Sequence, residues 1–140
     1  MSMQWDATPA FLFFYKKGGI VKKVVFTTSG QDLAAAMDPR FGRAANFLIY
    51  DMEQKSIKLI GNLEGRDAAQ GAGVQAAETV VRAGADTLVT GHCGPKALKV
   101  LDAAGVVVYN CNAATIEEAL TGLLSGSLQL ASASDAEENW

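Results

Sequence analysis

The order of apolar and polar blocks along the chain predicts a mixed α/β domain. Short β-branched runs between turn residues are typical of buried strands, and apolar positions three or four residues apart are typical of helices on a sheet. On this basis we expect five strands, at residues 22–28, 46–52, 56–62, 86–90 and 106–110. Three helices are expected, which begin near residues 74, 95 and 115.

Several residues predict where these helices begin and end. Gly84 and Gly105 suit the position after a helix, and Pro95 suits a first helical turn. Thr115 and Glu118 have the spacing of a capping box. The residues expected to face the core are Val74, Ala76, Ala77, Val80 and Val81 in the first helix, Ala97, Leu98, Leu101 and Ala104 in the second, and Ile116, Ala119, Leu120 and Leu123 in the third.

The predicted order β-β-β-α-β-α-β-α implies a particular sheet. The short turn at 53–55 makes strands two and three antiparallel, and right-handed crossovers make strands four and five parallel to strand one. We therefore expect a mixed five-stranded sheet with helices on both faces. The loops after strands one, three, four and five then leave the same edge, where open α/β sheets bind ligands.

The two ends of the chain differ from this domain. Residues 1–20 show no clear period, so we interpret them as an N-terminal extension, either an added or upstream-start segment or a real arm that packs on a partner. The domain is expected at 21–130. Residues 131–140 are small, polar and acidic, and are expected to form a frayed tail.

Composition excludes several classes of protein. The 140 residues suffice for one domain, and a net charge of −3 without a basic stripe argues against nucleic-acid binding. Two cysteines do not form a secreted disulfide framework, so a reducing cytoplasm is expected. No apolar run approaches the roughly 20 residues of a membrane span. A P-loop and a serine nucleophile elbow are also absent from the sequence.

The stretch GHCGP after the fourth strand contains the only histidine, His92, and one of the cysteines, Cys93. Free N–H groups at a helix start favour an anion, and they would lower the pKa of Cys93. The equally weighted alternative is that Gly91 and Gly94 serve only a tight turn, with an inert Cys93.

Cys111 follows the fifth strand and could approach Cys93. Two thiolates and the His92 imidazole are too few for a structural zinc site, but they would suit a thiophilic metal or the rim of a metal–sulfur cluster. The alternative is that Cys111 is a small buried residue at a strand end.

Two further loops offer groups that bind anions. Arg40 and Arg43 lie three residues apart, and two guanidinium groups suit an anion with many acceptor atoms. Alternatively they pair with Asp38 or Asp51. Gly71 and Gly73 precede and open a helix, which is a second, weaker anion cradle.

A two-metal nuclease is a weaker hypothesis. Asp32, Asp38, Asp51 and Asp86 are its candidate ligands. However, Asp51 and Asp86 fall at opposite ends of their strands, and the first strand carries no carboxylate.

The blocks DPRFGRA, GAGVQAA and GHCGPKA occur in this order, followed by TIEEAL. Together they resemble the dinitrogenase iron–molybdenum cofactor biosynthesis family, which includes nitrogenase accessory proteins and the orange proteins. The resemblance covers residues 22–130 and includes neither end of the chain.

This resemblance implies a ribonuclease H-like fold without nuclease activity. It implies a non-enzymatic protein that binds a molybdenum-containing metal–sulfur cluster, with copper or iron. Arg40, Arg43 and the amides of two helix starts would hold the cluster without a covalent bond, whereas ligation by Cys93, His92 or Cys111 would be specific to this chain. A cluster-assembly or ATPase protein is the partner implied, and the chain would act as a monomer or homodimer. The alternative is a regulatory or scaffold domain that senses a cluster.

Overall fold

A computed structural model describes residues 15–16, 19–62 and 71–131. The remaining positions lie outside the described residues, and so do most of the extension and the tail expected from the sequence. Within the described residues no helix has the length and apolar character needed to cross a bilayer.

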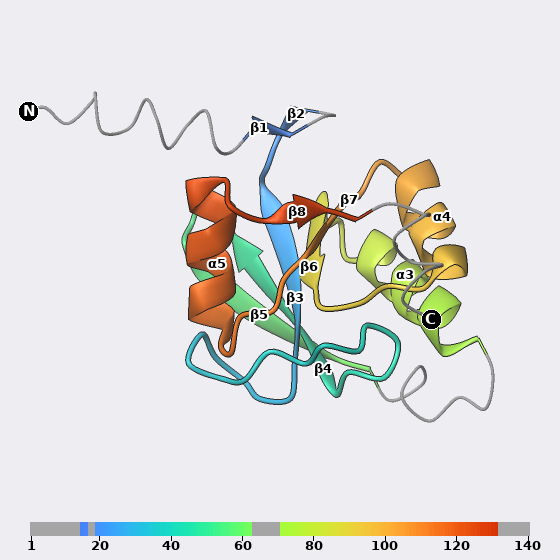
Figure 1. Cartoon of the computed structure of the whole chain (residues 1–140), viewed down its shortest axis with the longest axis horizontal. Helices are drawn as coiled ribbons and strands as arrows, with labels where there is room; N and C mark the ends of the chain where they lie inside the picture. Colours follow the sequence, from blue (N-terminus) through green and yellow to red (C-terminus); the bar gives the residue numbers. More distant parts are fainter. Residues whose placement is uncertain (1–14, 17–18, 63–70, 132–140) are drawn as a thin grey trace, which may run out of the picture.

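The described chain forms eight strands and three helices (Figure 1). The strands are β1 (Tyr15–Lys16), β2 (Gly19–Ile20), β3 (Lys23–Thr28), β4 (Asn46–Asp51), β5 (Ser56–Gly61), β6 (Thr87–Thr90), β7 (Val107–Asn110) and β8 (Gln129–Leu130). The helices are α3 (Ala72–Arg82), α4 (Pro95–Ala103) and α5 (Ile116–Ser125).

Six of these strands form one open sheet in the order β5-β4-β3-β6-β7-β8. The β3–β4 and β4–β5 pairs are antiparallel, whereas β3–β6 and β6–β7 are parallel, which confirms the predicted strand directions. The expectation of five strands is wrong, because the short β8 pairs antiparallel with β7. β8 has only two residues, which is too short for an alternation of apolar and polar positions, so the sequence pattern could not reveal it. The ribonuclease H-like assignment stays a prediction.

Helices cover both faces of the sheet, as predicted (Figure 1). α3 and α4 pack on one face around a first core cluster that includes Phe41, Phe47, Leu88 and Leu101. α5 packs on the other face around a second cluster that includes Phe26, Leu48 and Ile116.

The predicted helix faces are buried, with three differences. Val74 and Val81 are half-buried, and Ala104 is exposed because it is the C-cap residue beyond the last turn of α4. Thr115 caps α5 as expected, since its hydroxyl accepts a hydrogen bond from the Glu118 N–H at 3.2 Å. The Glu118 carboxylate accepts from the Ala114 N–H at 3.2 Å, one residue before the cap.

Candidate functional site

Three segments meet in a cavity of about 460 Å³ at the carboxyl edge of the parallel strands. One segment is the connection between β3 and β4, the second is the start of α3, and the third is the turn from β6 into α4. The lining residues are Arg40, Phe41, Gly42 and Arg43, then Gly71, Ala72, Gly73 and Val74, and finally His92, Gly94, Pro95, Lys96 and Ala97.

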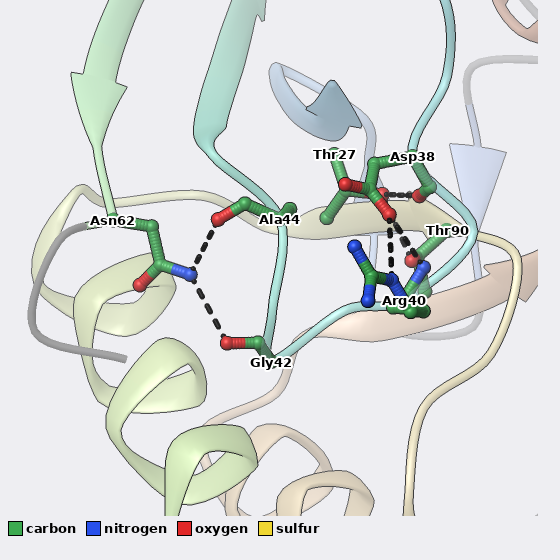
Figure 2. A network of polar contacts seen from close by, with 7 residues as sticks. All are labelled: Thr27, Asp38, Arg40, Gly42, Ala44, Asn62 and Thr90. Carbon is green, nitrogen blue, oxygen red and sulfur yellow. Dashed lines mark hydrogen bonds and ion pairs between the residues drawn. The ribbon is translucent and has the colours of Figure 1, made fainter. Parts of the chain in front are cut away.

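Buried threonines hold the first segment in place. The Thr27 hydroxyl donates to the Asp38 carbonyl at 2.6 Å and lies 2.9 Å from the Thr90 hydroxyl (Figure 2). Thr27 is fully buried, so these bonds fasten the loop to the ends of two central strands. The side chain of Phe41 is only 2% exposed and packs against Phe47, with 5.9 Å between ring centroids. Phe41 thus anchors the loop between its two arginines.

Asn62 holds the other end of this loop. Its side-chain amide donates to the carbonyls of Gly42 at 3.2 Å and Ala44 at 2.8 Å (Figure 2). Its backbone N–H donates to the Ala45 carbonyl at 3.0 Å. Since Asn62 is buried and does not line the cavity, it supports the wall from behind.

The loop also contacts the turn after β6. Arg40 and His92 form a parallel bridge, and the Phe41 N–H donates to the His92 carbonyl at 3.2 Å. A β-carbon on Gly91 would lie 2.7 Å from the Cα of Pro39. Gly91 therefore permits a close approach between the two chain segments, and it does not line the cavity.

Two helices begin at the cavity without a side-chain cap. Gly71 is the N-cap of α3, in the left-handed conformation at φ 75°, and Gly94 is the N-cap of α4, which has a proline in its first turn. Neither first turn contains an acidic residue. In contrast, α5 has the Thr115 cap and two glutamates in its first turn. Because the first N–H groups of a helix have no acceptor within it, the starts of α3 and α4 favour an anion.

The charged side chains that line the cavity in the described part of the chain have one sign. Among the described residues, Arg40, Arg43 and Lys96 line the cavity, and no Asp or Glu does. The alternative expected for the arginines, an ion pair with Asp38 or Asp51, is present in part, because Arg40 Nε lies 3.6 Å from Asp38 Oδ1. The Arg40 side chain is nevertheless 68% exposed, so this pair is weak and leaves most of the guanidinium accessible.

Cys93 differs from its expected chemistry. It is 2% exposed within the first core cluster, and burial raises the pKa of its thiol to about 12. The prediction of a lowered pKa is wrong, because desolvation outweighs any effect of the nearby helix start. Cys93 does not line the cavity.

The other two predicted metal ligands, Cys111 and His92, do not form a metal site with Cys93. Cys111 is buried in the second core cluster, on the other face of the sheet, where its sulfur accepts from the Ala113 N–H at 3.4 Å. His92 lines the cavity, but its Nε2 atom is buried. Among the residues that the structure describes, no group of three or more His, Cys, Asp or Glu side chains could hold a metal ion.

The carboxylates of the nuclease hypothesis serve separate local roles. Asp38 accepts from the Arg40 N–H, and Asp51 accepts from the amides of the turn between β4 and β5. Asp86 accepts from two amides that precede and begin β3, and Asp32 accepts from the Ala34 N–H. Asp51 and Asp86 lie at the opposite end of the strands from the cavity.

Lys96 in the lining and Asn62 behind it are two polar residues of this site that were not identified from the sequence. Lys96 was identifiable, since it follows Pro95 in the first turn of a helix predicted to begin at the ligand edge. No sequence pattern indicated a role for Asn62, because its hydrogen-bond partners are main-chain carbonyls 18 and 20 residues earlier in the chain.

Comparison with known proteins identifies a family to which this chain is similar in sequence. The family model described as dinitrogenase iron-molybdenum cofactor matches residues 22–126. An uncharacterized protein of Methanocaldococcus jannaschii is 30% identical over 95 residues, which cover 66% of this chain and 80% of the relative.

Two solved structures are similar in both sequence and fold. The apo form of the orange protein from Desulfovibrio gigas is 34% identical, with a TM-score of 0.77 over 80% of this chain and 94% of that one. A candidate NifB protein from Thermotoga, of the DUF35 family, is 30% identical, with a TM-score of 0.69 over 78% and 92% of the two chains.

Proposed function

Because this chain belongs to the dinitrogenase iron–molybdenum cofactor family, we propose that it binds and carries an anionic metal–sulfur cluster. The cluster would contain molybdenum, with copper or iron, and the role would be binding during assembly or storage in the cytoplasm. One observation carries the proposal: three cationic side chains and two helix starts without a side-chain cap line the same cavity, and no carboxylate lines it among the residues that the structure describes.

The chemistry of the lining suits a sulfide cluster. Arg40, Arg43 and Lys96 supply positive charge at the rim, and the N–H groups of α3 and α4 are donors for sulfur or oxygen. The rest of the wall is largely apolar, with Phe41 and Val74, which suits polarizable sulfur better than a strongly hydrated oxyanion. A volume of about 460 Å³ lies within the range of small-ligand sites.

We favour non-covalent binding of the cluster over ligation by cysteine. Cys93 is a protonated thiol in the core at neutral pH, and Cys111 lies on the opposite face of the sheet. Ligation by Cys93, His92 or Cys111 stays a prediction, and the two cysteines would have to leave their present positions for it.

The sensing or scaffold role remains the rival hypothesis. An exposed apolar helix face would favour it, but the exposed large apolar side chains among the described residues are Ile57, Leu59 and Leu130, all on edge strands. Among the described residues, no exposed apolar helix face supports that role. An N-terminal arm would also favour it, and most of that segment lies outside the described residues.

The proposal can be tested with protein purified from anaerobic cells and with apoprotein reconstituted with tetrathiomolybdate and copper(I). We expect a visible absorption band with stoichiometric molybdenum and sulfide, lost in the Arg40→Ala, Arg43→Ala double variant. Arg82→Ala is the matched control, because Arg82 lies in the last turn of α3, far from the helix start. A wild-type protein that stays colourless after both treatments would contradict the carrier role.

A further inference from the structure

Asn62 holds the wall of the cavity that carries Arg43. Its amide donates to the carbonyls on both sides of that residue, those of Gly42 and Ala44, and Figure 2 shows both carbonyls pointing from the loop toward Asn62. Arg40 lies on the opposite side of the loop in this view. One side chain thus fixes the orientation of two peptide groups at the cavity edge.

The direction of these carbonyls matters for an anion. A trans peptide group has its N–H roughly opposite to its C=O. When the Gly42 carbonyl points to Asn62, behind the lining, the Arg43 N–H points away from Asn62. Without the amide, the peptide could rotate and turn a carbonyl oxygen toward the ligand, where it would repel negative charge.

The same contact sets the distance between two walls. The Gly42 carbonyl accepts from the Asn62 amide, and a β-carbon on Gly42 would be 2.8 Å from the Gly73 nitrogen in the first turn of α3. A shift of Gly42 would therefore move the loop relative to the helix start. Asn62 directly follows β5, so it links that strand to the loop.

We propose that Asn62 is a positioning residue of the anion site, which acts by holding the segment from Gly42 to Ala44 and thereby Arg43. This inference rests on the proposed function for its affinity readout. It assigns Asn62 no direct contact with the ligand, because the side chain does not line the cavity.

The chain offers a matched control. Asn46 is also an asparagine whose amide donates to a carbonyl of the same connection, that of Gly30, at 2.9 Å. It holds the end of the loop that does not reach the cavity. Asn62→Ser and Asn46→Ser therefore remove the same amide group from the two ends of one loop, with two hydrogen bonds lost at Asn62 and one at Asn46.

The test measures affinity for tetrathiomolybdate with copper(I) in two double-mutant cycles. We expect Asn62→Ser to bind about tenfold more weakly and Asn46→Ser to stay within about twofold of wild type. In a variant that already has Arg43→Ala, Asn62→Ser should lower the affinity little further, because both changes act on the Arg43 side chain as an anion ligand. Combined with Lys96→Ala on α4, its effect should be additive, since Lys96 is held by another element. Wild-type affinity for Asn62→Ser, or equal coupling to both partners, would overturn the proposal.

One further measurement and one further variant allow the positioning role of Asn62 to be tested even if the protein binds no thiomolybdate or Asn62→Ser does not fold. If wild-type protein binds no thiomolybdate, the proposed function fails, and the amide chemical shifts of Gly42, Arg43 and Gly73 in ligand-free protein decide the positioning role. These shifts should change in Asn62→Ser and not in Asn46→Ser, and unchanged shifts overturn the inference. Should Asn62→Ser not fold, Asn62→Gln keeps the amide one methylene further out and should weaken binding by a smaller factor.

Discussion

Gly42 lies so close to Gly73 that a β-carbon on Gly42 would be 2.8 Å from the Gly73 backbone nitrogen. The same β-carbon would lie 3.0 Å from the carbonyl carbon of Ala72. These are backbone atoms at the start of α3, which cannot move aside as a flexible side chain could. The contact therefore closes one corner of the cavity, between the arginine-bearing loop and the helix that supplies N–H donors.

Gly42→Ala should consequently damage both stability and binding. We expect the free energy of unfolding to fall by about 1–3 kcal/mol, because the added methyl group must displace main chain. Affinity for tetrathiomolybdate with copper(I) should fall as the loop moves off α3. Denaturant unfolding and ligand titration measure the two effects.

Gly61→Ala provides the control for this substitution. A β-carbon there would meet nothing within 4 Å. Its stability should change by no more than about 0.5 kcal/mol. Equal behaviour of the two variants would show that the contact between Gly42 and α3 does not constrain the protein.

Lys96 should contribute to anion binding through its charge. It lies in the first turn of α4 and lines the cavity, whereas Lys99 is exposed on the same helix one turn later and does not. We expect Lys96→Ala to lower affinity about threefold at low ionic strength and Lys99→Ala to have little effect. The difference should shrink in about 1 M salt, because exposed charges are then screened. Titrations at two salt concentrations test this, and a salt-independent loss would indicate a packing role instead.

Much of the fold was predictable because its signals are local. The β-branched runs place the five longer strands of the main sheet, and Gly84 and Gly105, both with φ above +80°, end their helices as predicted. The family resemblance is confirmed by the match over residues 22–126. β8 was missed, because its pairing with β7 depends on tertiary position and not on residue type.

The site was less predictable, because burial and distant contacts decide its chemistry. Residue type and spacing place Arg40 and Arg43 on a loop at the ligand edge, where the structure has them. The same reasoning gave Cys93 a lowered pKa, although the side chain points into the core and is desolvated. It also allowed Cys111 to approach Cys93, but the two side chains belong to core clusters on opposite faces of the sheet. Cys93 lies in the turn beyond the end of β6, where the alternation of strand residues no longer fixes the direction of a side chain.

The cysteine pair should be dispensable for cluster binding if the cluster is held without covalent bonds. We expect the Cys93→Ala, Cys111→Ala variant to retain the metal and sulfide stoichiometry of wild type after reconstitution. The physical reason is that the two thiols belong to different core clusters and neither lines the cavity. Elemental analysis and the visible spectrum check the outcome. Loss of the cluster in a variant with a native circular dichroism spectrum would support direct ligation.

Stability at alkaline pH should report the burial of Cys93. Its pKa is raised from 9.0 to about 12 in the folded protein, so the unfolded chain loses this proton near pH 9 whereas the folded chain keeps it. Between pH 9 and 12 the unfolded state therefore binds fewer protons, and the free energy of unfolding falls as pH rises, by at most about 1.4 kcal/mol per pH unit from this group. Below pH 9 the contribution is fully present.

Cys93→Ala isolates this effect from other groups that titrate in the same range, such as Tyr109, whose pKa burial also raises. The variant should be less stable by a constant amount below pH 9, because a small cavity remains in the core. Above pH 9 the gap between wild type and variant should narrow, since only wild type loses the thiol contribution. Urea unfolding at pH 8 and pH 10.5 measures the two gaps. A gap of unchanged size would mean that the folded thiol ionises as readily as the unfolded one, and that Cys93 is accessible to solvent and to metals.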